Sequence, residues 1–308
     1  MIRRLKTTLS VVLTFCIFMP LFSVTGCSKF NEIREKVQSE QAEEKELKID
    51  DSDDFLKSYE KKIRKALADK DKSALKALFC QTVIDTTADM DEGLEYIINM
   101  ADWSTYTGGA DHCHSIKEYG GGFTWEYFIA NAACEADGVR YRIFFEGFGW
   151  YYDENSFVAE HVGLVKLYIA VLDDNGDVTG LPCTELNGIY HPGREPLENI
   201  INVVLNESST SVDVDSVMSP DLLNSADKDE LDALYELAGL DPKRKKNDIY
   251  FFVGEQDGGY VVSSVVHTNL DDHCLSLLIK DGVLSGAVLS DDENMKKPHA
   301  GELKGFEL

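Results

Sequence analysis

The chain has 308 residues and a formal net charge of −25, with 44% hydrophobic and 10% aromatic residues. This apolar content is sufficient for a folded core, and the length suits one large domain or two modest ones. Because binding to a nucleic-acid backbone requires clustered Lys and Arg, the acidic composition argues against nucleic acid as a partner.

The first 26 residues have the pattern of an export signal. Arg3, Arg4 and Lys6 form a positively charged start, and an apolar run follows from Val11 to Val24. This run is shorter than the roughly 20 apolar residues that a membrane-spanning helix requires. We therefore predict that residues 1–26 are a signal peptide and not a transmembrane anchor.

The signal ends in Val24-Thr25-Gly26-Cys27, which resembles the lipobox of bacterial lipoproteins, although that family most often has Leu at the position of Val24. The resemblance implies cleavage before Cys27, a diacylglyceryl thioether on its sulfur and a further acyl chain such as palmitate. Two acyl chains anchor a protein stably, whereas one binds only marginally. We expect lipid attachment at Cys27 and a location on the outer face of the bacterial cytoplasmic membrane; the alternative is a soluble secreted protein in which Cys27 is incidental.

Residues 27–51 are predicted to form the lipidated tether. Glu, Lys and Gln dominate the stretch from Glu35 to Lys48, which offers too little apolar surface to pack against a core.

Three helices are predicted next from apolar residues at helical spacing. The first begins near Ser52, the second follows Asp71 or Ser73, and the third spans Met90 to Met100. Their apolar faces consist of Phe55, Leu56, Tyr59, Ile63 and Leu67, of Leu75, Leu78 and Phe79, and of Leu94, Ile97 and Ile98.

Strands follow, because the apolar period changes to two. One series is Phe123, Trp125, Tyr127 and Ile129, a second is Tyr141, Ile143 and Phe145, and a third strand runs from Val162 to Leu172. A two-residue loop, Asp137-Gly138, would set the first series beside Arg140, Arg142 and Phe144. A three-residue loop beginning at Ala136 places both apolar series on one face, and burial favours that register.

Helices followed by a strand meander predict an α+β fold in which N-terminal helices pack on a curved antiparallel sheet. Such an order is similar to the NTF2-like, cystatin-related fold, and more closely to a group of Gram-positive lipoproteins of uncharacterised function that carry this domain. The segments behind the resemblance are Lys76-Ala77-Leu78-Phe79, Met90-Asp91-Glu92, Arg140 to Phe145, and Asp153-Glu154-Asn155 ahead of Val162-Gly163-Leu164. We place the domain at residues 52–178. The resemblance implies no particular reaction, since this fold hosts isomerases, dehydratases and non-catalytic binders.

A second α+β domain of similar order is predicted for residues 179–308, after a connection around His191-Pro192-Gly193; an unrelated small α+β domain is the alternative. Helices are expected from Pro196 to Val204 and from Asp227. The expected strands are Ile249 to Val253, Tyr260 to His267, Cys274 to Ile279 and Val283 to Leu289, with turns at Gly258-Gly259 and Asp281-Gly282.

Metal binding has one weak candidate pair, His112 and His114, which would share one face of a strand. No third ligand is indicated by spacing, so we predict no metal site and no cofactor. The cysteines contain no CxxC spacing, and their pairing is left open.

Catalysis by a pocket carboxylate has Asp89, Glu126 and Glu146 as candidates. In the favoured register, Glu126 and Glu146 point away from the apolar face, and surface carboxylates are the default in so acidic a chain. We therefore predict no catalytic residue.

Aromatic residues provide the candidate ligand contacts, which are Trp125, Tyr127, Tyr141, Phe145, Trp150 and Tyr151. Most are expected in the core, because aromatic strands pack well against helices. We predict a non-catalytic binding module for a small ligand or an envelope partner; the alternative is an enzyme of the NTF2-like isomerase or dehydratase type that uses a pocket carboxylate or histidine.

Overall fold

The computed structural model describes residues 36, 39, 42–120, 123–154, 156–179, 185–205, 219–220, 251–256, 258–267, 272–290 and 306–307. The chain divides into two units, Met1–Lys48 and Ile49–Leu308. In the first unit, residues 42–47 are helical. The predicted lipid site Cys27, the signal peptide and the helix expected from Asp227 lie outside the described residues.

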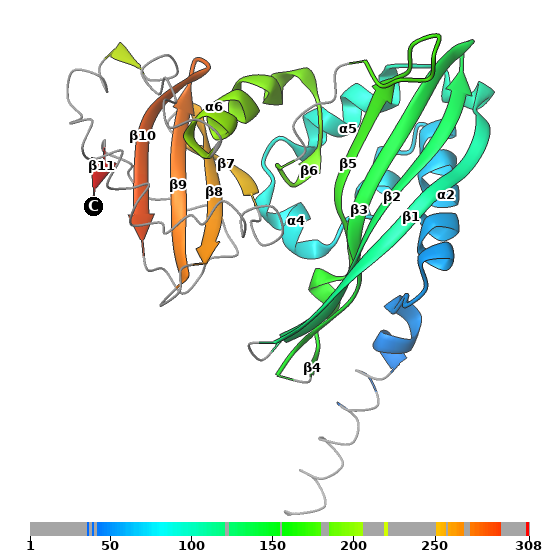
Figure 1. Cartoon of the computed structure of the whole chain (residues 1–308), viewed down its shortest axis with the longest axis horizontal. Coiled ribbons are helices and arrows are strands. Elements are labelled where there is room, and N and C mark those ends of the chain that lie inside the picture. The colour runs from blue at the N-terminus through cyan, green and yellow to red at the C-terminus, as the bar shows by residue number, and fades with distance from the viewer. Residues whose placement is uncertain are drawn as a thin grey trace, which may run out of the picture. The chain divides into compact units, whose positions relative to one another are not determined.

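The second unit contains two sheets and a small number of helices (Figure 1). Its helices are α2 (Ser52–Ala68), α3 (Lys72–Lys76), α4 (Gln81–Thr86), α5 (Met90–Asn99) and α6 (Glu195–Leu205), with 3-10 turns η1 (Trp103–Thr105), η2 (Ala159–His161) and η3 (Pro192–Arg194). Its strands are β1 (Thr107–Gly120), β2 (Phe123–Ala136), β3 (Val139–Asp153), β4 (Ser156–Phe157), β5 (Gly163–Val171), β6 (Gly188–Ile189), β7 (Phe251–Gln256), β8 (Gly259–His267), β9 (Asp272–Lys280), β10 (Val283–Ser290) and β11 (Phe306–Glu307).

The first sheet has the order β1-β2-β3-β5-β6, with β4 added to β3. All its pairings are antiparallel except that of β5 with β6. This large, mainly antiparallel sheet and a second sheet confirm the α+β class. Within the described ranges, no helix has the length and apolarity that crossing a bilayer requires.

Helix α2 covers one face of the first sheet, as its apolar spacing predicts. The Asp51 side chain accepts hydrogen bonds from the backbone N–H groups of Asp53 and Asp54, which fixes the start of the helix. The Phe55 ring stacks on Phe128 at a centroid distance of 4.5 Å and lies 6.2 Å from the Phe145 ring. The rings of α2, β2 and β3 therefore form one continuous core.

The other predicted helices are found with altered bounds. Asp71 caps α3 by accepting from the Ala74 N–H, but α3 ends before Leu78, and the short helix α4 was not predicted. Helix α5 matches the third predicted helix almost to its ends.

The predicted three-residue loop between β2 and β3 is wrong. Ala136 pairs with Val139, so that Asp137 and Gly138 alone form the turn. Both have positive φ angles, 54° and 72°, as a type I′ turn requires. An Asp-Gly turn of this type matches the twist of the strands, and its local preference sets the register.

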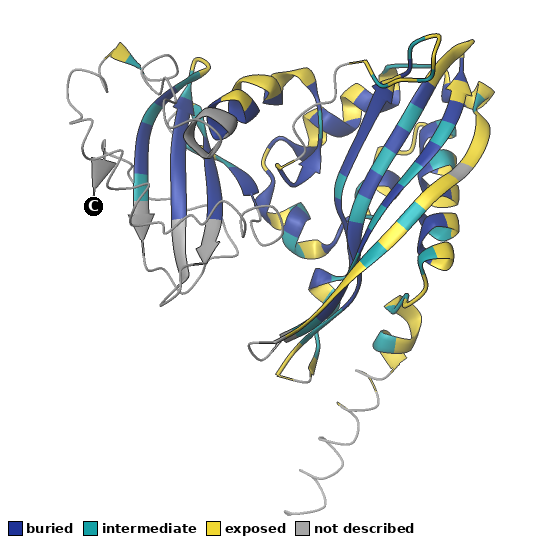
Figure 2. Ribbon diagram, viewed as in Figure 1, coloured by how far each residue is buried: buried dark blue, intermediate teal, exposed yellow. Residues whose placement is uncertain are grey.

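This register places a run of small residues, after Phe128, along the buried face of β2. That face carries Phe128, Ala130, Ala132, Cys134 and Ala136, which alternate with half-buried or exposed residues (Figure 2). Opposite them on β3, Tyr141 lies across from Cys134 and Ile143 across from Ala132. Small side chains on one strand leave room for the large ones of its neighbour and of α2.

The second sheet is an antiparallel meander of β7 to β10, with β11 added parallel to β10. The four predicted strands are confirmed, as is the Asp281-Gly282 turn, where both φ angles are positive. Strand β7 also bonds to the chain near the first sheet, since the Phe251 carbonyl accepts from the Asn187 N–H. The domain boundary at residues 178 and 179 stays a prediction.

Candidate functional site

The six aromatic residues predicted as ligand contacts lie mainly inside the protein. Trp125, Tyr141, Phe145 and Trp150 are buried, and Tyr127 and Tyr151 are half-buried. Trp125, Tyr127 and Tyr151 all contact the Phe148 ring edge-on, at centroid distances of 5.0 to 5.6 Å. Their apolar surfaces therefore mostly face one another, which is the core role expected for most of them.

Glu126 is buried, so its expected place on the surface is wrong. It is 2% exposed, because it has the same orientation on β2 as Phe128, toward the face that α2 covers. The Trp150 Nε1–H donates to its carboxylate at 2.9 Å, and Lys117 Nζ lies 3.0 Å away. These two contacts give Glu126 a structural role.

Glu146 is also engaged within the sheet. Its carboxylate accepts from the Tyr127 hydroxyl at 2.8 Å, and Lys166 Nζ is 3.9 Å away. Neither Glu126 nor Glu146 lines the cleft described below.

His112 and His114 lie side by side on the exposed part of β1, with ring centroids 5.8 Å apart. Within the described parts of the chain, no group of three or more His, Cys, Asp or Glu is arranged to hold a metal ion. Cys113 between them is a free thiol whose pKa burial raises to about 11, so it stays protonated at neutral pH.

A buried cluster of charges surrounds Asp89, the third candidate carboxylate. Arg194 forms a double contact with it, Nε to Oδ2 at 2.8 Å and Nη2 to Oδ1 at 2.5 Å. His191 Nε2 lies 3.1 Å from Asp89 Oδ2. Asp89 is 4% and Arg194 1% exposed, so the pair is removed from water. The cluster joins the residue before α5 to the turn η3.

The electrostatics of this cluster keep Asp89 ionised. Burial by itself would raise the pKa of Asp89, but the Arg194 charge and the hydrogen bonds from His191 and Arg194 outweigh it and hold the pKa below its ordinary value. A carboxylate held in this way is a poor proton acceptor near neutral pH. Its geometry is that of a structural ion pair.

The surroundings of Arg194 are polar but incompletely bonded. Arg194 Nη1 donates to the Asn187 carbonyl at 2.5 Å, while the fully buried Asn187 amide group makes no hydrogen bond to any residue that the structure describes. Gly188 has a φ of 94°, and a Cβ there would lie 2.8 Å from Thr87 Cγ2. Only glycine fits this close approach, which lets β6 pass over the cluster.

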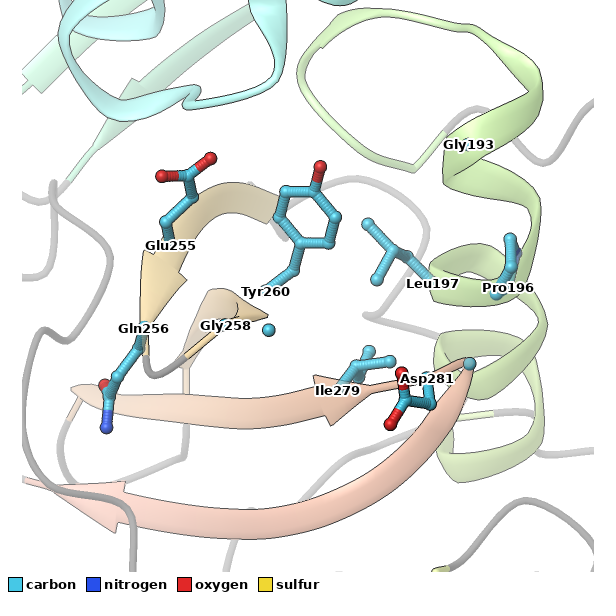
Figure 3. Close-up of a pocket in the computed structure, with 11 residues that line it drawn as sticks. Gly193, Pro196, Leu197, Glu255, Gln256, Gly258, Tyr260, Ile279 and Asp281 are labelled. Atoms are coloured by element: carbon cyan, nitrogen blue, oxygen red, sulfur yellow. The ribbon is translucent and has the colours of Figure 1, made fainter.

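A cleft of about 680 Å³ lies beside the cluster, between the start of α6 and two turns of the second sheet (Figure 3). Its lining residues are Gly193, Pro196, Leu197, Glu255, Gln256, Gly258, Gly259, Tyr260, Ile279, Asp281 and Gly282. The β7-β8 and β9-β10 turns supply most of them, and η3 and α6 supply the opposite wall. In Figure 3 the Tyr260 hydroxyl and the Glu255 carboxylate point to the same side of the cleft.

Gly193 separates the cleft from the charge cluster. A Cβ at this position would lie 2.9 Å from His191 Cε1 and 3.5 Å from Glu92 Oε1. The pKa of Tyr260 is raised, first by burial and then by the negative charges of Glu92, Asp89 and Glu255. The phenol in the cleft therefore experiences the carboxylates of both the cleft and the cluster.

Sequence reasoning nominated Asp89 but not its partners or the cleft. His191 and Gly193 are in the stretch predicted as a connection, and Arg194 follows them directly. Arg194 lies 105 residues from Asp89 in the chain, so no local spacing could join the two. The available signal was an Arg and a His beside Pro and Gly in a segment without an apolar pattern.

Comparison with protein families gives one match, in the region of the first sheet. Residues 62–174 match the model of a domain of unknown function, DUF5104. No curated protein and no solved structure matches the chain. The matched segment runs from within α2 to just after β5, so the chain is similar to this family over the helix-covered sheet and not over the cleft.

Proposed function

We propose that this protein is a lipid-anchored extracytoplasmic binding protein of the bacterial cell membrane. In this proposal a lipid on Cys27 holds the tether at residues 27–51, an NTF2-like domain occupies residues 52–178, and a second α+β domain follows. The protein binds a small ligand, or a protruding group of an envelope partner, without chemical conversion. The cleft at Tyr260 is the proposed binding site.

The observation that carries the binding proposal is the cleft itself. Its volume, about 680 Å³, lies within the roughly 300–1,000 Å³ of small-molecule sites. It combines apolar groups, Leu197 and Ile279, with the polar ends of Tyr260, Glu255 and Asp281. The described residues of its lining offer carboxylates and a phenol, but no His or Lys that could assist them in group transfer. This set of groups suits recognition better than group transfer.

The NTF2-like assignment is supported by the packing of α2 along a long antiparallel sheet. That fold leaves a pocket between helix and sheet, whereas here Phe55, Phe128 and Phe145 fill this region. The proposal therefore assigns a supporting role to the first sheet and ligand binding to the second.

A catalytic alternative rests on Asp89 and His191. A carboxylate that orients an imidazole is a frequent arrangement for a general base. His191 is 3% exposed and lies behind Gly193, so the enzyme version requires this wall to open. A turnover that Glu92→Gln alters and His191→Gln abolishes, in protein that still binds its ligand, would favour the enzyme.

Membrane anchoring is tested with Cys27→Ser. The wild type should be found in the membrane fraction and labelled by a clickable palmitate analogue, while the variant should be unlabelled and released. A Cys113→Ser variant controls for loss of an unrelated thiol. Unchanged membrane recovery of Cys27→Ser would remove the anchor from the proposal.

Ligand binding is tested by native mass spectrometry after incubation of the full chain with a metabolite extract. We expect the wild type to retain a small molecule and Glu255→Arg to lose it. Glu118→Arg, on the exposed part of β1, is the control for a charge reversal away from the cleft. Retention of the same molecule by all three proteins, or by none, contradicts binding in the cleft.

A further inference from the structure

We propose that the cleft recognises an organic cation, a molecule with at least one ammonium group on an apolar stem. This inference rests on the proposed binding function and specifies the chemical class of its ligand. It follows from the charges of the lining, from the charges behind it and from the shape of the site.

The lining carries negative charge only. Glu255 and Asp281 contribute carboxylates from the β7-β8 and β9-β10 turns, and among the described residues that line the cleft none is Lys, Arg or His. An anionic ligand would meet these carboxylates without a compensating partner, and the like charges would repel one another. A cationic ligand would instead be paired with these carboxylates.

The charges on the far side of Gly193 from the cleft do not make the site positive. Arg194 is a buried cation one residue after Gly193 of the lining, but its guanidinium is paired with Asp89 through two hydrogen bonds. Glu92 lies close behind Gly193 with a side chain that is 61% exposed and adds negative charge. Burial is the first cause that raises the pKa of the Tyr260 phenol, and the charges of Glu92, Asp89 and Glu255 raise it further, while Arg194 acts in the opposite direction.

Two sources of positive charge near the cleft are weak. The start of α6 carries the positive end of a helix dipole, but Glu195 and Glu198 stand in its first turn and oppose it. Lys280 packs its Cγ against Gly259, while Lys280 itself is outside the lining.

The remaining groups fit an organic stem. Tyr260 offers an aromatic ring, which attracts an ammonium placed over its face. Leu197 and Ile279 offer apolar contact for methylene groups. A bare metal ion is less well suited, since in the described part of the chain no three His, Cys, Asp or Glu converge. The volume also exceeds that of one ion.

The test uses three linear probes of equal length and different charge. Cadaverine is a dication, 1,5-pentanediol is neutral and glutarate is a dianion. Titrated calorimetrically into the full chain in detergent micelles, cadaverine should bind with one site per chain, and the other two should not bind. Raising the salt concentration should weaken cadaverine binding, because part of the attraction is screened.

Two variants locate the site. Glu255→Gln and Asp281→Asn should each weaken cadaverine about tenfold or more, since a hydrogen bond to a charged group contributes about 1.5–3 kcal/mol. Glu118→Gln is the matched control and should leave the affinity unchanged. Thermal melting shows whether each variant is folded.

The outcomes separate the two proposals. No binding of cadaverine, equal binding of the diol, or cadaverine binding that survives both cleft variants overturns the cation assignment; the last result would reflect attraction to the acidic surface as a whole. If the metabolite extract still yields a molecule that Glu255→Arg loses, the binding function stands with another ligand class. If the extract also yields nothing, both proposals fail.

Discussion

The helix-covered face of the first sheet and the turn end of the second sheet show two opposite uses of a β-sheet. On the first, Phe55 stacks on Phe128 and the space between helix and sheet is filled by side chains. On the second, glycine-containing turns and the start of α6 enclose a cleft with carboxylates and a phenol. The difference lies in the side chains. Aromatic rings fill the space between α2 and the first sheet, whereas the short turns of the second sheet leave a cleft open.

This comparison indicates that aromatic content is a poor guide to the binding surface of this protein. The strands richest in aromatic residues, β2 and β3, bury most of those rings. Among the described residues that line the cleft, Tyr260 is the one aromatic. Its position next to Glu255 and near the Asp89 cluster makes that ring a candidate for recognition.

The largest expected effect is in the closed core. Phe55→Ala should reduce the free energy of unfolding by about 3–5 kcal/mol, because it removes a fully buried ring and leaves a cavity. Denaturant unfolding followed by tryptophan fluorescence measures the loss. Tyr119→Ala, at a side chain 69% exposed, is the control and should change stability by less than about 0.5 kcal/mol. A small effect at Phe55 would mean that the first sheet is less tightly closed than described.

The buried charge cluster should be nearly as sensitive. Asp89→Asn leaves the Arg194 guanidinium buried without a countercharge and should destabilise the protein by about 3 kcal/mol. Asp91→Asn removes an exposed carboxylate paired with Lys76 and should cost no more than about 1 kcal/mol. Equal effects in denaturant unfolding would contradict a structural role for the cluster.

The dependence of stability on pH follows from the lowered pKa of Asp89. In the unfolded chain this carboxyl has its ordinary pKa of about 3.8, and in the folded chain its pKa is lower. Its contribution is therefore fully present above about pH 4 and decreases as the pH falls through the folded pKa. Unfolding measured between pH 3 and pH 7 should show the wild type approaching Asp89→Asn at the acid end. A constant difference across this range would exclude the ion pair as its source.

The turn that sets the register of the first sheet should give a smaller effect. Gly138 has a φ of 72°, and Gly138→Ala should destabilise by about 1–2 kcal/mol because a Cβ disfavours left-handed backbone. Gly109 in β1 has open space around it, and Gly109→Ala should be neutral or slightly stabilising. If both variants behave alike in thermal unfolding, the two-residue turn is not what fixes the register.

The smallest effect on stability is expected in the cleft. Glu255 is exposed at the β7-β8 turn, so Glu255→Gln should change the free energy of unfolding by less than about 0.5 kcal/mol. A variant that is stable but loses cadaverine would separate binding from folding. Strong destabilisation would instead assign Glu255 to the structure.

The sequence predicted α2 and α5 well because their apolar spacing reflects burial directly, whereas α3 has other bounds and α4 was not predicted. The faces of α2 and α5 are set by residues such as Ile63 and Leu94, which are fully buried. The register of β2 and β3 was mispredicted, since periodicity could not weigh the Asp137-Gly138 turn against the burial of large side chains. The cleft was missed, because its residues come from separate turns that only the fold brings together.

The first residue of the larger unit, Ile49, is bonded to an inner strand of the first sheet. The Ile49 N–H donates to the Gly149 carbonyl at 2.9 Å, and a Cβ on Gly149 would lie only 2.1 Å from the Ile49 carbonyl oxygen. If Cys27 is held in a membrane, a mechanical pull on the protein would enter here, at an inner strand of the sheet. The joint at Gly149 would therefore act as a force-bearing attachment as well as a packing contact.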